Sequence, residues 1–186
     1  MISISYFQIL LVISILWFLT RAVVWVKNRT IRLKRELQLL LVYICLIVVA
    51  RFTFCPFFPV DGKIPPLIFD PDRAFPCWVN FLPFVYLFDY PNLLETLLNI
   101  IGNVTMFLPL GIVWPVVFKE LNTPGKAIAA GAGVSLTIEV LQLPFYDRAT
   151  DVDDLLMNTA GFILGYLILC LVRSCRKVRS ERYVRL

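Results

Sequence analysis

Long apolar segments limit this chain to folds that place most of it inside a bilayer. Residues 4–20 are almost entirely apolar, and hydrophobic residues make up 59% of the 186 residues while charged residues make up 17%. A water-soluble fold of this length would need long polar faces, whereas about 20 apolar residues are enough to cross a bilayer as a helix. The apolar segments run, approximately, over residues 4–26, 37–54, 93–118, 127–145 and 152–172.

These segments predict an all-α, polytopic transmembrane bundle of about five spans. Short loops rich in Lys and Arg remain in the cytoplasm, and the cations of this chain concentrate after the first, third and fifth segments. We therefore expect the amino terminus outside and the carboxyl terminus inside a bacterial cytoplasmic membrane. The net charge of +5 then belongs to the cytoplasmic rim, where it can touch anionic lipid and requires no nucleic acid partner.

The connection between the second and third segments, about 35 residues long, is expected to lie outside the cell. It is rich in proline and aromatic residues, which suits a stretch at the membrane interface. Cys55 and Cys77 fall at its start and middle, and whether they form a disulfide is left open by the sequence. The aromatic residues of the second half of this loop are Trp78, Phe81, Phe84, Tyr86 and Phe88.

The chain contains no histidine, which excludes His-based acid/base catalysis and most zinc sites. Its five cysteines form no C-x-x-C pair. Any chemistry must therefore use carboxylates, amides, Arg, Ser or Cys, and we expect no metal and no cofactor.

The fifth segment carries a polar stripe at its outer end. Asp151, Asp154 and Asn158, followed by Gly161 and Gly165, step by three and four residues and so share one helical face. The two glycines allow a neighbouring backbone to approach closely. Helix capping by Asp151 or by the threonine before it explains part of this stripe, but Asn158 sits one turn further into the membrane.

The third and fourth segments carry similar stripes. Glu139 and Gln142 lie near the outer end of the fourth segment, and Asn99, Gly102 and Asn103 lie near the outer end of the third. Intramembrane acids usually face the bundle interior, where they pair or mark a functional site. We therefore expect the three stripes to converge on one hollow that opens outward. The rival interpretation is that the buried acid only holds the helices together through an ion pair.

A faint internal repeat suggests a partner for Glu139. Arg51 and Glu139 each stand five residues before a Pro-Phe pair at a segment exit. If one two-helix unit is used twice, the two charges lie at matching depth, and we expect a buried ion pair between them.

Four motifs follow one another along the chain: Asn80-Phe-Leu-Pro-Phe, Asn99-x-x-Gly-Asn-x-x-x-Phe-x-Pro-x-Gly, Ser135-x-x-x-Glu-x-x-Gln, and Arg148-x-x-Asp-x-x-Asp-x-x-x-Asn-x-x-Gly. In this order they resemble the VanZ-like family. The resemblance implies a membrane domain over residues 37–172. The residues on either side follow from composition alone: we expect an anchor helix and a basic cytoplasmic loop over 1–36 and a basic cytoplasmic tail over 173–186.

The resemblance also implies a link to resistance to the glycopeptide teicoplanin, without a known reaction. Together with the polar hollow, it favours a non-catalytic or transport-like protein that engages an anionic lipid headgroup, a lipid-linked wall precursor or a glycopeptide. Arg148, Arg51 and Arg73 are candidates for contacting phosphate. The residues expected to bind the ligand are Arg51, Asn99, Asn103, Glu139, Gln142, Arg148, Asp151, Asp154 and Asn158, and those expected to pack helices are Gly102, Gly161 and Gly165.

Two alternatives stay open. In the first, Glu139 and Asp154 act as an acid/base pair or as Mg²⁺ ligands of an intramembrane hydrolase or transferase that acts on a lipid phosphate. No nucleophile motif or phosphate-binding glycine loop supports it, so enzyme activity is the less favoured interpretation. In the second, the chain is a structural or assembly subunit, and its polar residues serve packing and capping.

Overall fold

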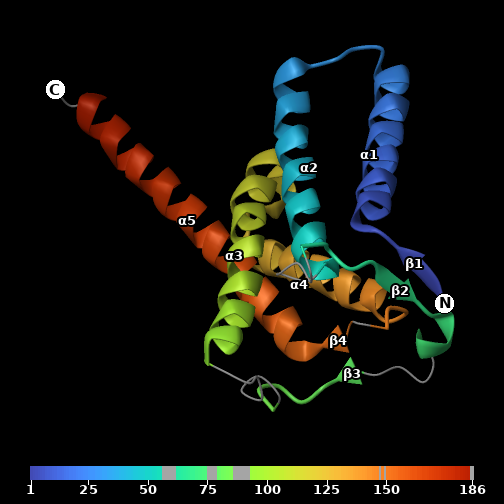
Figure 1. Ribbon diagram of the computed structural model, residues 1–186. Coiled ribbons are helices and arrows are strands. Elements are labelled where there is room, and N and C mark those ends of the chain that lie inside the picture. The colour runs from blue at the N-terminus through green and yellow to red at the C-terminus, as the bar shows by residue number, and fades with distance from the viewer. Residues whose placement is uncertain (56–61, 75–78, 86–92, 147, 149, 185–186) are drawn as a thin grey trace.

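The protein is described by a computed structural model that covers residues 1–55, 62–74, 79–85, 93–146, 148 and 150–184 (Figure 1). Cys77, Trp78, Tyr86 and Phe88 lie outside the described residues. Cys55 is buried as a free thiol. Phe81 and Phe84 are exposed, with 75% and 60% of their surfaces accessible.

Each apolar segment forms a helix close to its predicted bounds. These helices are α1 (Tyr6–Asn28), α2 (Leu33–Phe54), α3 (Leu93–Val117), α4 (Pro124–Gln142) and α5 (Val152–Val184), with short 3-10 turns η1 (Pro71–Ala74) and η2 (Lys119–Leu121). α5 runs well past residue 172 because charged side chains do not by themselves end a helix.

Four of these helices, α1, α2, α3 and α5, are long and apolar enough to cross a membrane. The molecule is therefore a multi-pass membrane protein. α4 falls outside that group, because Glu139, Gln142 and several small residues lower its hydrophobicity. The number of five spans and the orientation in the membrane stay predictions.

Two short ladders of strands join the ends of the helices, a feature that the expectation of an all-α fold did not include. β1 (Ile2–Ile4) pairs antiparallel with β2 (Leu67–Phe69), and β3 (Val79–Asn80) pairs parallel with β4 (Thr150–Asp151). Such strands are too short to leave a period-two pattern in the sequence. They form because the tertiary structure brings their backbones together.

The centre of the bundle is a close contact between α3 and α5. A Cβ atom on Gly161 would lie 2.2 Å from the carbonyl oxygen of Val104, and one on Gly165 would lie 2.1 Å from that of Leu108. Both glycines therefore lie where the backbones of α3 and α5 come closest. Gly102 is half-buried on α3, and its packing role stays a prediction.

Gly111, the last residue of the second motif, makes a third contact of this kind, although the sequence analysis gave it no packing role. A Cβ atom there would lie 2.0 Å from the carbonyl oxygen of Phe162. The side chains of Phe107, Leu110 and Phe162 are fully buried beside this contact and form the centre of the core.

α4 returns the chain to the start of α5. The order of the contacts, Val104 to Gly161 and Leu108 to Gly165, shows that α3 and α5 run parallel. The connection between them must therefore travel back along the bundle, and α4 does so across α5 (Figure 1). This return brings the end of α4 next to the first turn of α5, where the polar residues lie.

Candidate functional site

α4 presents one polar face to the interior of the bundle. Ser135, Glu139 and Gln142 are spaced by four and three residues and are all buried, with at most 5% of their surfaces accessible. The opposite face of α4 carries exposed residues such as Leu136 and Val140. The predicted polar stripe of this segment therefore faces inward.

Asn158 meets this face from α5. Its Nδ2 atom donates to Ser135 Oγ at 3.0 Å, and both side chains are at least 99% buried. The other polar atom of the amide, Asn158 Oδ1, is buried and has no hydrogen-bond partner. A buried carbonyl oxygen without a donor is unfavourable unless something else supplies one.

Glu139 lies one helical turn nearer the end of α4 and is 97% buried. Its Oε2 atom accepts a hydrogen bond from the backbone N–H of Asp151 at 3.0 Å, and its backbone carbonyl accepts one from Thr150 Oγ1 at 3.0 Å. Glu139 Oε1 accepts no hydrogen bond from the described residues. Glu139 thus ties the end of α4 to the start of α5, and its Oε1 atom has no donor among the described residues.

Asp154 connects α5 to α3. Its Oδ1 atom accepts from Asn103 Nδ2 at 2.6 Å, and the same Nδ2 atom lies 3.2 Å from Asn99 Oδ1. The structure therefore brings the predicted residues of the third, fourth and fifth segments together at one end of the bundle. Among the described residues, nothing donates to Asp154 Oδ2.

Asp151 and Asp153 accept hydrogen bonds that stabilise the start of α5 and the segment that packs against it. Asp151 Oδ1 accepts from the backbone N–H of Asp153 at 2.9 Å, which caps α5, and from Asn80 Nδ2 at 3.1 Å. Both carboxylate oxygens of Asp153 accept from the backbone N–H of Phe84, at 2.9 and 3.1 Å. The two acids thus fasten the segment around Asn80 and Phe84 to the start of α5.

Gln142 links the site to α2. Its Nε2 atom donates to the backbone carbonyl of Thr53 at 2.7 Å, and its Oε1 atom is buried without a partner. Gln142 therefore resembles Asn158: in both amides the NH₂ group donates a hydrogen bond and the buried oxygen accepts none.

The three arginines predicted to contact phosphate, Arg51, Arg73 and Arg148, have different neighbours in the structure. The Arg51 guanidinium lies over the ring of Tyr6, 5.7 Å from its centroid. Among the described residues it forms no ion pair with Glu139, so the predicted pairing is wrong. α1 instead places the Tyr6 ring beside Arg51, and Arg51 is not among the charges of the described residues that act on Glu139.

Arg73 donates to the backbone carbonyl of Tyr146 and stacks on its ring at 4.7 Å. Arg148 interacts electrostatically with Asp154 and is the predicted phosphate contact that lies with the acids.

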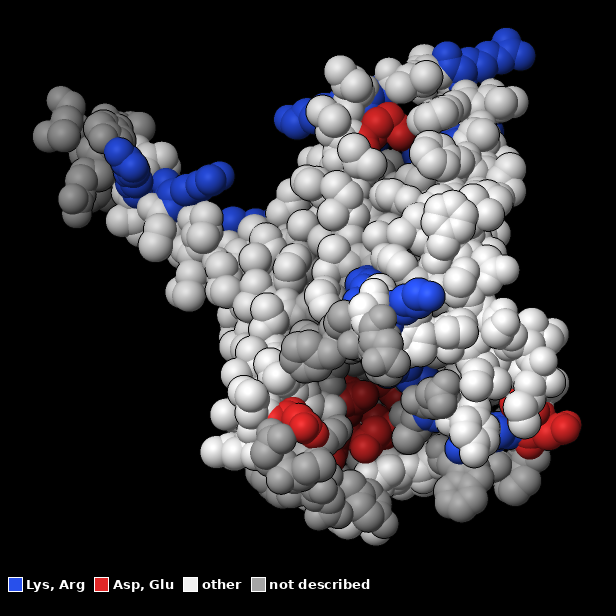
Figure 2. Space-filling view, viewed as in Figure 1, with Lys and Arg blue, Asp and Glu red and all other residues white. Residues whose placement is uncertain are grey.

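Four acceptor oxygens thus remain without a donor from the described residues: Glu139 Oε1, Asp154 Oδ2, Asn158 Oδ1 and Gln142 Oε1. Acidic side chains are set back in a hollow on the face shown in Figure 2. Lys and Arg side chains appear at the α1–α2 turn, along the end of α5 and also beside this hollow (Figure 2). Within the described residues, no group of three or more Cys, Asp or Glu side chains is arranged to hold a metal ion. The arrangement suits a ligand that donates hydrogen bonds.

Sequence reasoning did not count Asn80, Asp153 or the backbone of Thr53 among the site residues. Asn80 opens the first of the four motifs, which was the available signal. Asp153 falls off the stripe that begins at Asp151, so helical spacing pointed away from it. The carbonyl of Thr53 leaves no signal in a sequence.

Comparison with known proteins gives one family. A family model described as VanZ/LLP1 matches residues 40–173. Protein VanZ of Enterococcus faecium is 41% identical over 67 residues, a stretch that covers 36% of this chain and 41% of that protein. The match thus spans less than half the length of this relative. No solved structure matches the chain significantly.

Proposed function

The chain belongs to the VanZ/LLP1 family, and we propose that it contributes to glycopeptide (teicoplanin) resistance or cell-envelope lipid handling by engaging the headgroup of a lipid-linked precursor. The headgroup would bind where α3, α4 and α5 meet, at the end of the bundle predicted to face outward. The single observation that carries this proposal is that four acceptor oxygens at that point have no donor among the described residues, two of them the buried amide oxygens of Asn158 and Gln142.

The acceptor excess favours one part of the headgroup in particular. Carboxylates and amide oxygens bind hydroxyl and ammonium groups and repel phosphate. The sugar and amino groups of a lipid-linked precursor would therefore face Glu139, Asp154 and Asn158. Its anionic phosphate would face Arg148, which lies on the edge of the same cluster.

The burial of these acceptors supports a selective site. A site built to hydrogen-bond a particular donor rejects an analogue without it, because the buried partners are then left unsatisfied. We therefore expect a bare polyprenyl phosphate, which lacks the sugar, to bind much more weakly than the sugar-bearing precursor. Glycopeptides carry sugars and amines as well and are the competing ligand for this site.

The test is binding of a lipid-linked disaccharide-peptide precursor to the purified full chain, measured by native mass spectrometry. Glu139→Gln and Asp154→Asn each preserve size and remove a charge, and each should weaken binding about tenfold or more. Glu120→Gln is the matched control, because Glu120 is exposed on η2 away from the cluster. Equal binding by all of these variants and the wild type would overturn the proposal.

The same variants connect the site to a phenotype. Cells that express Asp154→Asn should lose teicoplanin resistance at an unchanged protein level. In the binding assay, Arg148→Ala should weaken only the contribution of the precursor's phosphate to the affinity. Loss of resistance only where the protein level falls would favour a structural subunit. Release of the lipid phosphate by the wild type would favour the hydrolase alternative.

A further inference from the structure

A cavity lies between α1 and α2, at the opposite end of the molecule from the acidic cluster (Figure 1). Its volume is about 630 Å³, and its walls come from the end of α1, the start of α2 and Phe118 beyond α3. Apart from Phe118, its lining residues precede residue 40 and so lie outside the segment matched by the family model. None of them belongs to the site described above.

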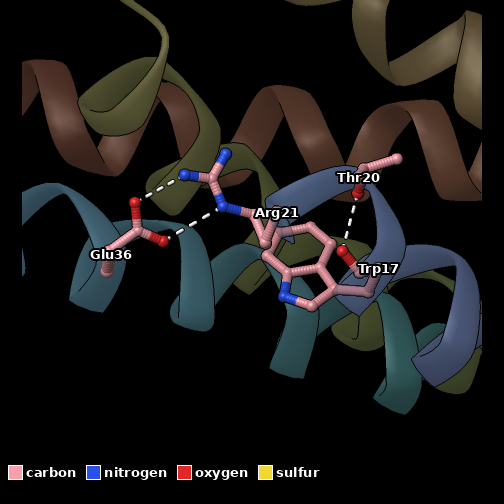
Figure 3. Close-up of polar contacts among 4 residues, drawn as sticks. All are labelled: Trp17, Thr20, Arg21 and Glu36. Atoms are coloured by element: carbon pink, nitrogen blue, oxygen red, sulfur yellow. Dashed lines mark hydrogen bonds and ion pairs between the residues drawn. The ribbon is translucent and has the colours of Figure 1, made fainter. Parts of the chain in front are cut away.

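The cavity carries an excess of positive charge. Arg21, Arg32 and Arg35 line it together with one acid, Glu36. Arg21 reaches from α1 to α2 and forms a two-point ion pair with Glu36, with Nε to Oε2 at 3.0 Å and Nη2 to Oε1 at 2.5 Å (Figure 3). This pair neutralises Glu36, and no carboxylate of the described residues pairs with Arg32 or Arg35.

Further donors point to an anion with several acceptor oxygens. Arg35 donates to the backbone carbonyl of Val117, which orients its guanidinium without neutralising it. The indole N–H of Trp25, another wall residue, lies near the Glu36 carboxylate but forms no hydrogen bond of good geometry with it. The guanidinium groups of Arg32 and Arg35 are complementary to a phosphate group.

A smaller apolar cavity of about 190 Å³ continues from the first one. The two share Arg21, Trp25 and Glu36, and the rest of the smaller one is formed by Trp17, Phe18, Leu37 and Leu40. These four residues lie nearer the middle of α1 and α2, in helices that are long and apolar enough to cross a membrane. A lipid accounts for both parts of this arrangement, because its phosphate fits the basic cavity and its acyl chain fits the apolar groove. A free anion would account for the basic cavity only.

We propose that the α1–α2 cavity binds an anionic glycerophospholipid, whose phosphate lies between Arg32 and Arg35 and whose acyl chain follows Trp17 and Leu40. Such a lipid would also fasten α1, which has no buried residue of its own, to the rest of the bundle. Basic pockets between spanning helices are a recognised way of binding anionic headgroups. The proposal does not depend on the function proposed for the acidic cluster.

The test uses the full chain in nanodiscs and in detergent. Native mass spectrometry should show phosphatidylglycerol retained in preference to phosphatidylcholine. Arg32→Gln should weaken phosphatidylglycerol retention about fivefold, the factor expected for one basic residue near a headgroup. Lys34→Gln is the matched control, because it removes the same charge two residues further along the chain, at a position that does not line the cavity. It should change retention less than twofold.

A second arm distinguishes a lipid from a free anion. Leu40→Phe, which narrows the groove, should also weaken retention, and inorganic phosphate at millimolar concentration should not displace the lipid. Trp25→Phe should reduce quenching of tryptophan fluorescence by brominated phosphatidylglycerol. Equal retention of the two lipids, equal loss with Arg32→Gln and Lys34→Gln, or displacement by inorganic phosphate would each overturn the proposal.

Discussion

The Nδ2 atom of Asn158 lies 3.0 Å from the hydroxyl oxygen of Ser135, while the Oδ1 atom of the same amide is buried without a partner. Half of this amide therefore serves the contact between α4 and α5, and the other half is available to a ligand. Because a structural contact and a proposed ligand contact meet in this residue, variants must be chosen so that folding and binding are measured separately.

The pair of Asn158 and Ser135 should be non-additive. Ser135→Ala leaves the Nδ2 atom without an acceptor and should lower the free energy of unfolding by about 1 kcal/mol. Adding Asn158→Leu removes the unsatisfied amide as well, so the double variant should be less destabilised than the sum of the single ones. Thermal unfolding in detergent measures this, with exposed Thr137→Val as control. Simple additivity would contradict the interpretation.

The helix contact at Gly161 should not tolerate a methyl group. Gly161→Ala places a Cβ atom 2.2 Å from the carbonyl oxygen of Val104, so α3 and α5 must separate. We expect a loss of several kcal/mol, well beyond the roughly 1–3 kcal/mol typical of overpacking. Gly133→Ala is the control, because no atom lies within 4 Å of its Cβ position. It should be neutral or slightly stabilising. Similar unfolding temperatures for both variants would argue against the close contact.

Asp153 and Asp154 should respond differently to the same substitution. Asp153→Ala leaves the backbone N–H of Phe84 without its acceptor and should cost about 1–3 kcal/mol, with faster hydrogen exchange around residues 79–84. Asp154→Ala should cost less, because Asn103 keeps its hydrogen bond to Asn99. The second variant should instead lose ligand binding. An interchange of these effects would show that the two carboxylates have been assigned the wrong roles.

The ion pair between Arg21 and Glu36 should hold α1 against α2. Glu36→Gln and Arg21→Gln should each weaken this contact, and a double-mutant cycle should give a coupling free energy of about 1 kcal/mol. The measurement is the unfolding of the full chain in detergent, and raised salt should reduce the coupling. A coupling near zero at low salt would mean that the pair does not stabilise the arrangement of α1.

Much of the fold could be predicted from the sequence. Apolar segments of spanning length form helices because a backbone in lipid must satisfy its hydrogen bonds internally. The spacing of Ser135, Glu139 and Gln142 placed them on one face, and all three are buried there. The close approach at Gly161 and Gly165 followed from the absence of side chains. These features follow from helical periodicity and side-chain size, which the order of residues determines.

The partners of the polar groups were decided by the tertiary structure. Asp151 caps α5 and holds Asn80, while Asp154 meets Asn103, although both acids lie on one predicted stripe. Arg51 lies against Tyr6, because the position of α1 determines which group is near it. Hydrogen bonds form only within about 3 Å and in the right direction. The register between helices sets such distances, and periodicity along one helix carries no information about that register.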